Sequence, residues 1–572
     1  MSNTNIYIHS PSSFNSSILV HMPSIYFLLK GDYMRNGKQS LRWLKPMYTE
    51  HSPLDTIKYL ERQLKGEDLH YFVMSVYIWN ENHMIDVSEM INMRWPSCKI
   101  IAGGYQVTKE WVEKYDYIDN VIIGDPEDIF YKIIDNEIDD SIVYNYLSGF
   151  FYSPIVDLQE ELIEMSIEAK EKYPEKNICY VWETNRGCPY SCSFCSWGLA
   201  SRKKIRRKSL DMIKDELDVF KYMKLDVFRV SDANFGIFKE DVEIMKMILS
   251  AVGDNVSYFD LSFAKNHKER VYEIAKMVDD YNLMPYVKVG IQDTDKEVGE
   301  AIKRAEKIPY ERTLELYRRS KIDAPLRLDI IVGLPMQSKE KYFNMLQDFV
   351  DKDLPTIPSG QPLVFLPNTP LAEPEYQKKY DLKWKKSKEC NPIYIPEKYR
   401  NLYREKLADS FAISKYKSIK STSVATADDL NEMHIFTGFI SAFHNRKLVK
   451  EKLNYIDLYE NLLKNPKYPH FYSLYKDHLN HIHSDESIGD VNVPLFKLNK
   501  HFWVHHSIYY YINLIGPDKD KYFDELFQYS GVCINEDIAT YDNCKIDNLD
   551  DFILQLGIAK NKLKPVWKKD FV

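Results

Sequence analysis

The chain has 572 residues, a formal net charge of −8 and 44% hydrophobic residues. This length suffices for about three to four domains with buried cores, and the acidic balance argues against nucleic acid as a partner. No run of about 18 apolar residues is present and the first residues lack the pattern of a secretory signal, so we expect a cytoplasmic protein without a membrane partner.

The first 140 residues alternate short apolar runs with amphipathic stretches. Apolar runs of this length predict buried strands, and the stretches between them have helical periodicity, which is typical of a Rossmann-like parallel sheet. We expect strands at Tyr71–Trp79, Cys98–Gly104 and Asp119–Asp125, with Ser17–Leu19 opening the series, and helices near Met84–Met93 and Val107–Lys114. Residues 1–140 are therefore predicted to form one α/β domain. Residues 141–176 are predicted to form a linker with one helix, Gln159–Lys172.

A second alternating region covers residues 177–370. Six βα units predict a partial (β/α)6 barrel of the TIM type, with ligands at the carboxyl ends of its strands. The predicted strands are residues 178–184, 227–232, 256–264, 286–292, 327–333 and 362–367, and the clearest helices are residues 210–221, 238–251, 268–281 and 339–350. The strand signal fades after this region. Residues 371–572 are therefore predicted to form a mainly helical domain that caps the substrate cavity.

Three of the eight cysteines stand close together in the segment RGCPYSCSFCSWG. Cys188, Cys192 and Cys195 have the spacing C-x3-C-x2-C, and the other cysteines offer no second C-x2-C pair to complete a zinc site. Clustered cysteines favour a metal site in a reducing compartment over disulfides. Three thiolates can hold a 4Fe-4S cluster and leave one iron open for an exogenous ligand. Zinc is the alternative.

The cysteine spacing, its place after the first strand of a six-unit array, and the aromatic Phe194 before the last cysteine resemble the radical SAM superfamily. The resemblance implies that the three cysteines ligate the cluster and that its open iron binds S-adenosylmethionine (SAM). It also places SAM contacts at the strand ends. The implied SAM contacts are Phe194, Asp232, Asn234, Gln292, Arg304 and Gly333.

Each of these implied contacts has a plainer interpretation. Asp232 and Asn234 lie in SDANFG, where a turn with helix-capping side chains would use the same residues. Gln292 could be a polar strand terminus, and Arg304 could lie on a solvated helix face. Gly333 belongs to IIVGLPMQS, which resembles a fifth-strand motif near adenine, with Met336 where the motif has glycine. VFLPNTPLAE resembles a sixth-strand motif.

The order of domains resembles the cobalamin-binding radical SAM enzymes. The segments MSVYIWNEN and IIAGGYQ correspond to loops that line cobalamin in that family. The implied cobalamin contacts are Tyr77, Trp79, Asn80, Gly103, Gly104 and Gly124. The sequence has no D-x-H-x-x-G motif, so no histidine ligand to cobalt is predicted. The family's G-E-G-E turn appears as GDPE (Gly124–Glu127), and because proline lacks an N–H, we expect a backbone contact to the cobalamin tail to be lost.

The resemblance implies an enzyme that uses the cluster, SAM and cobalamin to methylate an unactivated carbon of a small-molecule or peptide natural-product intermediate. An external one-electron reductant such as flavodoxin or ferredoxin would supply electrons. Catalytic side chains beyond the cofactor ligands are not assigned. Two alternatives stay open: a cobalamin-associated radical rearrangement or cyclisation, and a non-catalytic sensor or scaffold that keeps the cluster.

Two other features are predicted to be structural. The basic run SRKKIRRKS (Ser201–Ser209) is interpreted as a solvated loop before a helix, with Arg206 or Arg207 as a candidate contact to an anionic group. Histidines that are close in sequence near the C-terminus are not expected to bind metal. They are His478, His481, His483, His501 and His505.

Overall fold

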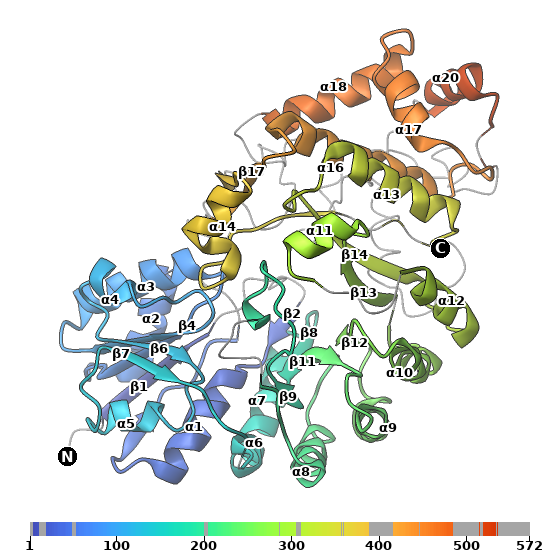
Figure 1. The fold of residues 1–572 in the computed structure, drawn as a ribbon. Coiled ribbons are helices and arrows are strands. Elements are labelled where there is room, and N and C mark those ends of the chain that lie inside the picture. The colour runs from blue at the N-terminus through green and yellow to red at the C-terminus, as the bar shows by residue number, and fades with distance from the viewer. Residues whose placement is uncertain are drawn as a thin grey trace. The chain divides into compact units, whose positions relative to one another are not determined.

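The computed structural model describes residues 4–10, 19–48, 53–150, 152–198, 204–284, 286–304, 310–355, 357, 360–387, 416–445, 447–483, 514, 519–533 and 535. The chain divides into two compact units (Figure 1). Unit 1 contains residues 1–262, 366–372 and 403–416, and unit 2 contains the rest. Each unit is described by itself.

The N-terminal part of unit 1 is a six-stranded parallel sheet with strand order β3-β1-β4-β5-β6-β7. Figure 1 shows α2, α3 and α4 on one face of this sheet and α1 and α5 on the other. The bounds are β1 Thr4–His9, α1 Ser24–Asn36, β3 Leu41–Trp43, α2 Pro53–Leu64, β4 Tyr71–Ser75, α3 Glu81–Arg94, β5 Lys99–Gly103, α4 Trp111–Lys114, β6 Asn120–Gly124, α5 Phe130–Ile134 and β7 Ile142–Asn145. The expected strands therefore form a doubly wound α/β sheet.

The core of this sheet explains why its strands are continuous apolar runs. Strand residues such as Phe72 and Ile100 pack against α2 and α3, for example against Leu60 and Ile91, and all four are fully buried. A parallel sheet covered on both faces needs apolar side chains at successive positions. Each such side chain contributes about 1.5–3 kcal/mol by leaving water.

The second sheet of unit 1 has strand order β12-β11-β8-β2. Its bounds, with the neighbouring elements, are β2 Leu19–His21, α6 Pro154–Asp157, α7 Gln159–Lys172, β8 Asn177–Trp182, β9 Asn185–Arg186, η1 Ser196–Gly198, β10 Arg206–Arg207, α8 Leu210–Phe220, β11 Val227–Phe235, α9 Asp241–Val252 and β12 Tyr258–Phe263. The strand around Leu19, expected in the N-terminal sheet, pairs in parallel with β8 instead. The Leu19 side chain packs against Cys179 of β8 and Val227 of β11, so its apolar partners belong to the second sheet and not to the N-terminal one.

Unit 2 contains a three-stranded parallel sheet, β13-β14-β15, and a helical part. The last predicted barrel strand is short: only Gln361–Pro362 pairs as β15, since Leu363 and Phe365 donate hydrogen bonds to Val332 and Lys417. The bounds are α10 Lys268–Asp280, β13 Val287–Gln292, α11 Lys296–Ala301, α12 Tyr310–Ser320, β14 Leu326–Val332, α13 Lys339–Asp351, β15 Gln361–Pro362, α14 Pro374–Lys379, β16 Lys383–Ser387, β17 Tyr416–Ser421, α16 Ala427–Asn445, α17 Tyr455–Leu458, η4 Tyr459–Leu463, α18 Pro469–His483 and α20 Lys519–Ser530. A 3-10 helix, η3 (Pro370–Ala372), belongs to unit 1.

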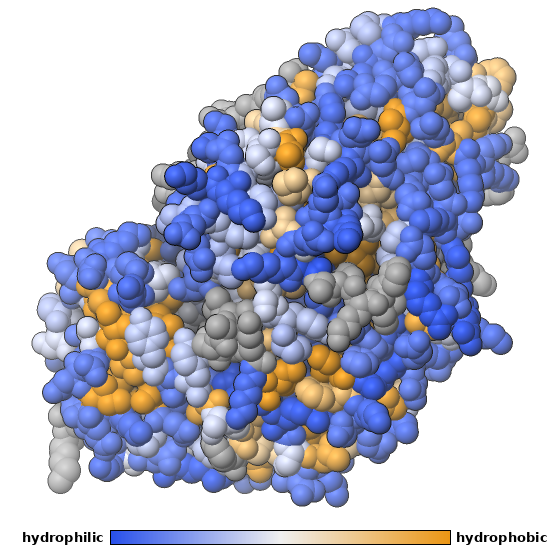
Figure 2. All heavy atoms as spheres, in the orientation of Figure 1, coloured by the Kyte–Doolittle hydropathy of each residue, from blue (hydrophilic) through white to orange (hydrophobic). Residues whose placement is uncertain are grey.

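Hydrophilic side chains cover most of the face in Figure 2. None of the helices in the described ranges is long and apolar enough to cross a membrane. Where the structure describes residues 371–572, it contains the helices α14, α16, α17, α18 and α20 and the two-stranded sheet β16-β17, which the sequence did not predict.

Candidate functional site

The three clustered cysteines lie on the loop between β9 and β10. Cys188 and Cys192 are buried and Cys195 is half-buried, and none of the three forms a disulfide. The side-chain amide of Asn234, at the carboxyl end of β11, donates a hydrogen bond to the Cys188 sulfur at 3.2 Å. An amide donor at a cysteine sulfur is a common way for a protein to tune an iron–sulfur cluster.

The arrangement of these thiols also bears on the zinc alternative. Among the described residues, no three histidine, cysteine, aspartate or glutamate side chains converge enough to hold a single metal ion. A structural zinc ion needs four ligands around one point. The three cysteine ligands of a cubane each bind a different iron and do not need to converge, so the donor set fits a cluster better than zinc.

The segment that leads into the cysteine loop is held by Asp232 of β11. Its carboxylate accepts hydrogen bonds from the backbone N–H of Thr184 at 2.8 Å, from the Thr184 hydroxyl, and from the Asn185 amide at 2.6 Å. Asp232 is fully buried, and burial raises its pKa to about 7. Both carboxylate oxygens are therefore used within the fold, and the structure gives Asp232 a role in positioning the end of β8.

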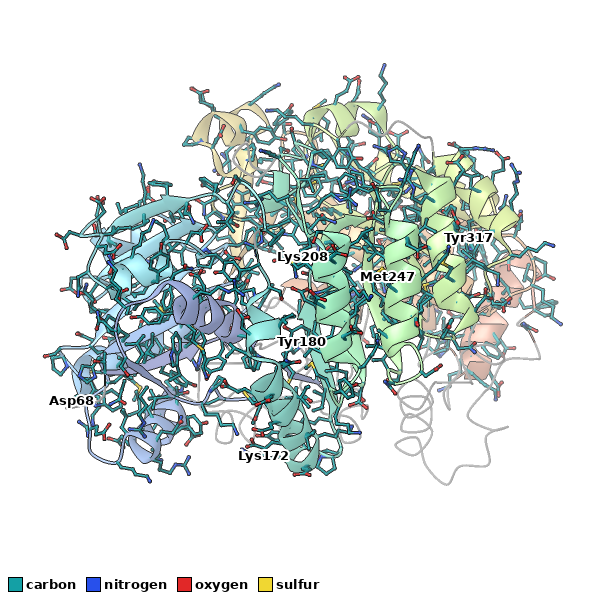
Figure 3. All side chains as sticks on the ribbon, turned by 90° about the horizontal axis from the view of Figure 1, so that it is seen from below. Asp68, Lys172, Tyr180, Lys208, Met247 and Tyr317 are labelled. Carbon is teal, nitrogen blue, oxygen red and sulfur yellow. The ribbon has the colours of Figure 1, made fainter. Side chains whose placement is uncertain are left out.

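The segment that leaves the loop is also anchored. Arg206 and Arg207 of β10 pair antiparallel with Arg186 and Asn185 of β9. The next residue, Lys208 (labelled in Figure 3), donates hydrogen bonds to both oxygens of buried Glu216 on α8, at 2.9 and 2.7 Å. The sequence predicted a solvated loop for this basic run. Arg206 is instead buried, because it pairs with β9 and its guanidinium contacts an acidic side chain.

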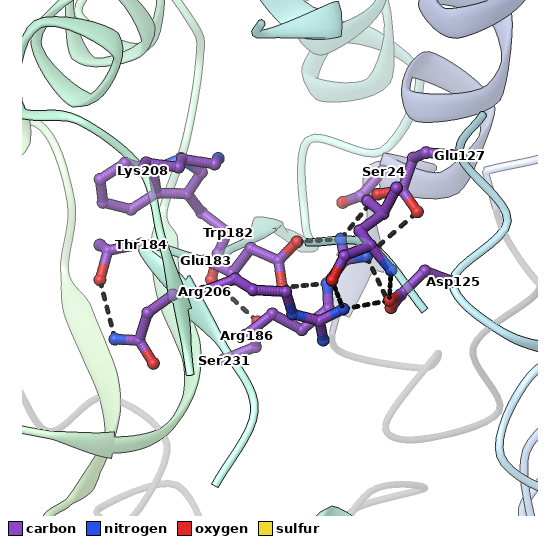
Figure 4. Close-up of polar contacts among 12 residues, drawn as sticks. Ser24, Asp125, Glu127, Trp182, Glu183, Thr184, Arg186, Arg206, Lys208 and Ser231 are labelled. Carbon is purple, nitrogen blue, oxygen red and sulfur yellow. Dashed lines mark hydrogen bonds and ion pairs between the residues drawn. The ribbon is translucent and has the colours of Figure 1, made fainter. Parts of the chain in front are cut away.

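That acidic side chain is Asp125, in the turn after β6 of the N-terminal sheet (Figure 4). Arg186 donates a hydrogen bond to one oxygen of Asp125 at 3.0 Å, and Arg206 donates to the other oxygen. Arg186 also pairs with Glu127 and Glu183. Burial raises the pKa of Asp125, but the two guanidinium groups outweigh it and hold the pKa below its ordinary value. One carboxylate of the N-terminal sheet thus contacts both sides of the cysteine loop.

A second connection runs through the segment Leu366–Ala372. The side-chain amide of Asn368 donates to the carbonyl of Val107 at 3.1 Å, in the loop after β5. The backbone N–H of Leu371 donates to the carbonyl of Ser193 at 2.9 Å, inside the cysteine loop. The NTPL part of the predicted sixth-strand motif therefore joins the cysteine loop to the N-terminal sheet.

The residues predicted to line cobalamin lie at the carboxyl ends of β4, β5 and β6. Tyr77 and Trp79 are half-buried and stack with ring centroids 4.7 Å apart, and Tyr105 lies 6.1 Å from Tyr77. Asn80 is buried, accepts a hydrogen bond from the Tyr77 N–H at 2.7 Å and donates to the Ser75 carbonyl at 3.1 Å. Asn80 therefore shapes the loop that carries the two stacked rings.

The three glycines predicted to contact cobalamin differ in what requires them. A Cβ on Gly104 would lie 2.3 Å from the Val76 carbonyl oxygen, and one on Gly124 would lie 1.9 Å from the Asn145 carbonyl oxygen. Both also have positive φ, so the fold itself requires glycine there. A Cβ on Gly103 would meet nothing nearer than 3.8 Å. Of the three, only Gly103 has room that the fold leaves unexplained.

The remaining SAM candidates lie in unit 2. Gln292 ends β13 with φ 68°, and its side-chain oxygen is buried without a hydrogen-bond partner in the described part of the chain. The guanidinium of Arg304 donates to the carbonyl of Gly290, and a Cβ on Gly290 would lie 2.9 Å from the Gln292 amide nitrogen. The structure thus brings Gln292 and Arg304 to the same glycine.

The motif after β14 is organised by Gln337. This fully buried side chain accepts from the Gly333 N–H at 2.7 Å and donates to Asp293 at 2.6 Å, and burial raises the pKa of Asp293 to about 6. Gly333 and Met336 both have positive φ, 87° and 65°. Met336 therefore adopts the left-handed conformation that the family's glycine would adopt freely, at a cost of about 1–2 kcal/mol.

The other residues named from the sequence lie as follows. Phe194 is half-buried in the cysteine loop. Arg207 pairs with Glu240 at 3.5 Å. His478 is buried in α18, while His501 and His505 lie outside the described residues, as do Cys390 and Cys544.

Comparison with known proteins agrees with this geometry. Residues 182–349 match the model of the Radical SAM superfamily. The chain is 28% identical over 339 residues to the cobalamin-dependent radical SAM methyltransferase TokK of Streptomyces tokunonensis, covering 54% of this chain and 49% of TokK. It is 27% identical over 338 residues to the 2-(S-pantetheinyl)-carbapenam-3-carboxylate methyltransferase of Streptantibioticus cattleyicolor, with the same coverage of each chain, 54% and 49%.

Among solved structures, the chain is similar to the radical SAM methyltransferase TsrM from Kitasatospora setae with cobalamin and a cluster bound, with a TM-score of 0.48 and 15% identity over 65% of this chain and 74% of that one. The chain spans about half the length of the curated relatives it matches. The match of residues 182–349 to the Radical SAM superfamily and the similarity to these two relatives confirm the resemblance to the cobalamin-dependent radical SAM methyltransferases.

The glycine geometry makes a stability prediction. Gly104→Ala should lower the free energy of unfolding by about 2–4 kcal/mol, because it adds both backbone strain and a clash with Val76. Gly66 has positive φ but open space around it, so Gly66→Ala should lower the free energy of unfolding by about 1 kcal/mol from backbone strain alone. Gly103→Ala should change it by less than about 0.5 kcal/mol. Urea denaturation of the three variants checks this, and equal losses at Gly104 and Gly103 would contradict it.

The contacts of Asp125 lead to a second prediction about stability. Asp125→Ala should lower the free energy of unfolding by about 3–5 kcal/mol, because it leaves the buried guanidinium of Arg206 without a counter-ion. Two nitrogens of Arg206 already lack a hydrogen-bond partner among the described residues. Arg206→Met should lower the free energy of unfolding by less, since Asp125 keeps its ion pair with Arg186. A larger loss in Arg206→Met than in Asp125→Ala, measured by the same denaturation, would refute this account of the pair.

Proposed function

We propose that this chain is a cobalamin-dependent radical SAM methyltransferase that acts on an unactivated carbon of a small-molecule or peptide substrate. The observation that carries the proposal is the loop with Cys188, Cys192 and Cys195, joined to the N-terminal sheet at Asp125 and at Asn368. The similarity to two methyltransferases supports methylation, and one of them, the 2-(S-pantetheinyl)-carbapenam-3-carboxylate methyltransferase, supports a small-molecule substrate.

The residues of the chain fit each group that this reaction needs. When bound, the cluster supplies the electron that cleaves SAM, and cobalamin carries the methyl group. Cys188, Cys192 and Cys195 would hold the cluster, and the Asn234 amide would donate to one of its sulfur ligands. Three thiol ligands leave one iron open for SAM.

Gln292 and Arg304 are our proposed SAM contacts. An orphaned buried oxygen such as Oε1 of Gln292 costs about 1–3 kcal/mol unless a ligand donates to it. Guanidinium groups such as that of Arg304 suit carboxylate recognition. Gly333 would lie near the adenine part, but the fold itself requires glycine there, because φ is positive and a Cβ would lie 2.5 Å from Ile419. Phe194 would cover the cofactor from the cysteine loop.

Tyr77 and Trp79 are our proposed contacts to the face of cobalamin. Their stacked, half-buried rings offer an apolar surface at the carboxyl end of a parallel sheet, where such folds bind ligands. Gly103 would allow close approach of the same ligand. The reaction also requires an external one-electron reductant, for which we propose a flavodoxin or ferredoxin. We propose no nucleic-acid partner.

Anaerobic reconstitution with iron, sulfide and hydroxocobalamin tests the proposal. We expect one cubane cluster per chain, a base-off cob(II)alamin paramagnetic resonance signal, and release of deoxyadenosine from SAM under strong reductant. Cys192→Ala should lose the cluster and deoxyadenosine release. Cys179→Ala is the matched control and should keep both, because Cys179 is a core thiol whose pKa burial raises to about 12.

Cobalamin binding is tested separately with a variant of Gly103. Gly103→Ala should retain less cobalamin at unchanged stability, because its new methyl group occupies space that the fold leaves open. A protein that binds the cluster and cleaves SAM but retains no cobalamin would move the assignment to cobalamin-independent radical chemistry. A cluster without SAM cleavage would favour a sensor or scaffold.

A further inference from the structure

The GDPE turn uses its backbone within the fold. The Asp125 N–H donates to the Asn145 carbonyl at 2.8 Å, and the Asn145 amide donates back to the carbonyls of Asp125 and Glu127 at 2.9 and 2.6 Å. The Pro126 carbonyl accepts from the Phe130 N–H at 2.9 Å. The backbone of this turn is therefore committed to β7 and to the start of α5, and its side chains are what it can offer to another part of the molecule.

Those side chains point to the cysteine loop. One oxygen of Asp125 contacts Arg186, two positions before Cys188, and the other contacts Arg206, which pairs with Arg186 across the β9–β10 ladder. The Leu147 N–H donates to the Arg206-side oxygen at 2.9 Å, and Arg206 also donates to the Leu147 carbonyl at 3.0 Å. Both sides of the loop are thus fixed to one carboxylate (Figure 4).

The burial of these groups makes the contact restrictive. The side chains of Arg206 and Asp125 are 3% and 6% exposed. Water cannot replace either partner at such positions, so a shift of the loop would leave a charge both buried and unpaired. Charge-assisted hydrogen bonds are also directional, which fixes orientation as well as distance.

We propose that Asp125 is a positioning residue for the iron–sulfur cluster. It sets where the cysteine loop stands against the loops at the carboxyl ends of β4, β5 and β6. This inference rests on the proposed function, because only a bound cluster gives the position of the loop a chemical consequence. Asp125 touches no cofactor in this account. It acts through Arg186 and Arg206.

The test compares Asp125→Asn with Asp226→Asn in the reconstituted full chain. Asp226 is a matched control: its carboxylate accepts from the Lys170 ammonium and the Ile178 N–H, both at 2.8 Å, near the opposite end of β8. The measurements are iron content, the paramagnetic resonance spectrum of the reduced cluster with and without SAM, and the rate of deoxyadenosine release per cluster.

We expect Asp125→Asn to bind iron, to show an altered SAM-dependent spectrum, and to release deoxyadenosine about 10-fold to 100-fold more slowly, the usual range for removing a residue that orients metal ligands. Asp226→Asn should lower the thermal midpoint but keep the wild-type spectrum and rate. Should Asp125→Asn fail to fold, Arg206→Gln removes one of the two contacts and should show the same change of spectrum with a smaller loss of rate.

The outcomes separate the two proposals. Wild-type rate and spectrum in Asp125→Asn, or in Arg206→Gln where that variant is used, would overturn the positioning role while leaving the proposed function intact. An equal slowing in Asp226→Asn would also overturn it, because the effect would then be general loosening of the fold. Wild-type protein that binds a cluster but cleaves no SAM would remove the proposed function, and this inference with it.

Discussion

A buried carboxylate with a guanidinium group on each side is the interaction on which the candidate site depends. Asp125 stands at the end of a strand in one sheet, and its two arginine partners flank the cysteine loop that follows β8 of another. Without these contacts, two arginines beside the loop would face a largely buried environment with fewer counter-ions. Two glutamates lie nearby, and in the described part of the chain Glu127 and Glu183 form ion pairs with Arg186. Arg206 depends on Asp125.

This arrangement gives the parallel sheet a second role. Strand ends in such sheets usually present backbone N–H groups and glycines to a ligand. Here the turn after β6 uses its backbone for β7 and offers carboxylates to the neighbouring loop, while the turns after β4 and β5 present stacked aromatic rings and Gly103. Under the proposed function, the end of β6 would position the cysteine loop and the ends of β4 and β5 would contact cobalamin.

Local pattern in the sequence predicted much of this fold. Apolar runs located β4, β5, β6 and β8, because strands buried on both faces need continuous apolar residues. Alternating apolar residues located β11, β13 and β14, in which buried and half-buried side chains alternate. The cysteine spacing predicted the loop because its chemistry is local. Of the strand expected at residues 362–367, only Pro362 lies in β15, because Phe365 and the backbone carbonyl of Leu363 form hydrogen bonds with β17 instead of β14.

What the sequence could not predict depends on contacts between distant residues. The sequence predicts a solvated loop around Arg206, because its partner Asp125 lies 81 positions away along the chain. The hydrogen bond between Asn368 and Val107 joins residues 261 positions apart. The sequence also could not predict which glycines the fold requires, since a clash with a Cβ depends on the position of a neighbouring backbone. The motif position of Met336 was visible, but its left-handed conformation was not.

The proposed function requires that the cysteine loop hold an iron–sulfur cluster and that the ends of β4 and β5 face cobalamin. Anomalous diffraction from anaerobic crystals of the reconstituted protein, recorded at the iron and cobalt absorption edges, tests it most directly. The account predicts an iron peak bounded by Cys188, Cys192 and Cys195 and a separate cobalt peak beside Tyr77 and Trp79. A single zinc ion with a fourth protein ligand at the cysteines, or cobalt bound away from these rings, would contradict it.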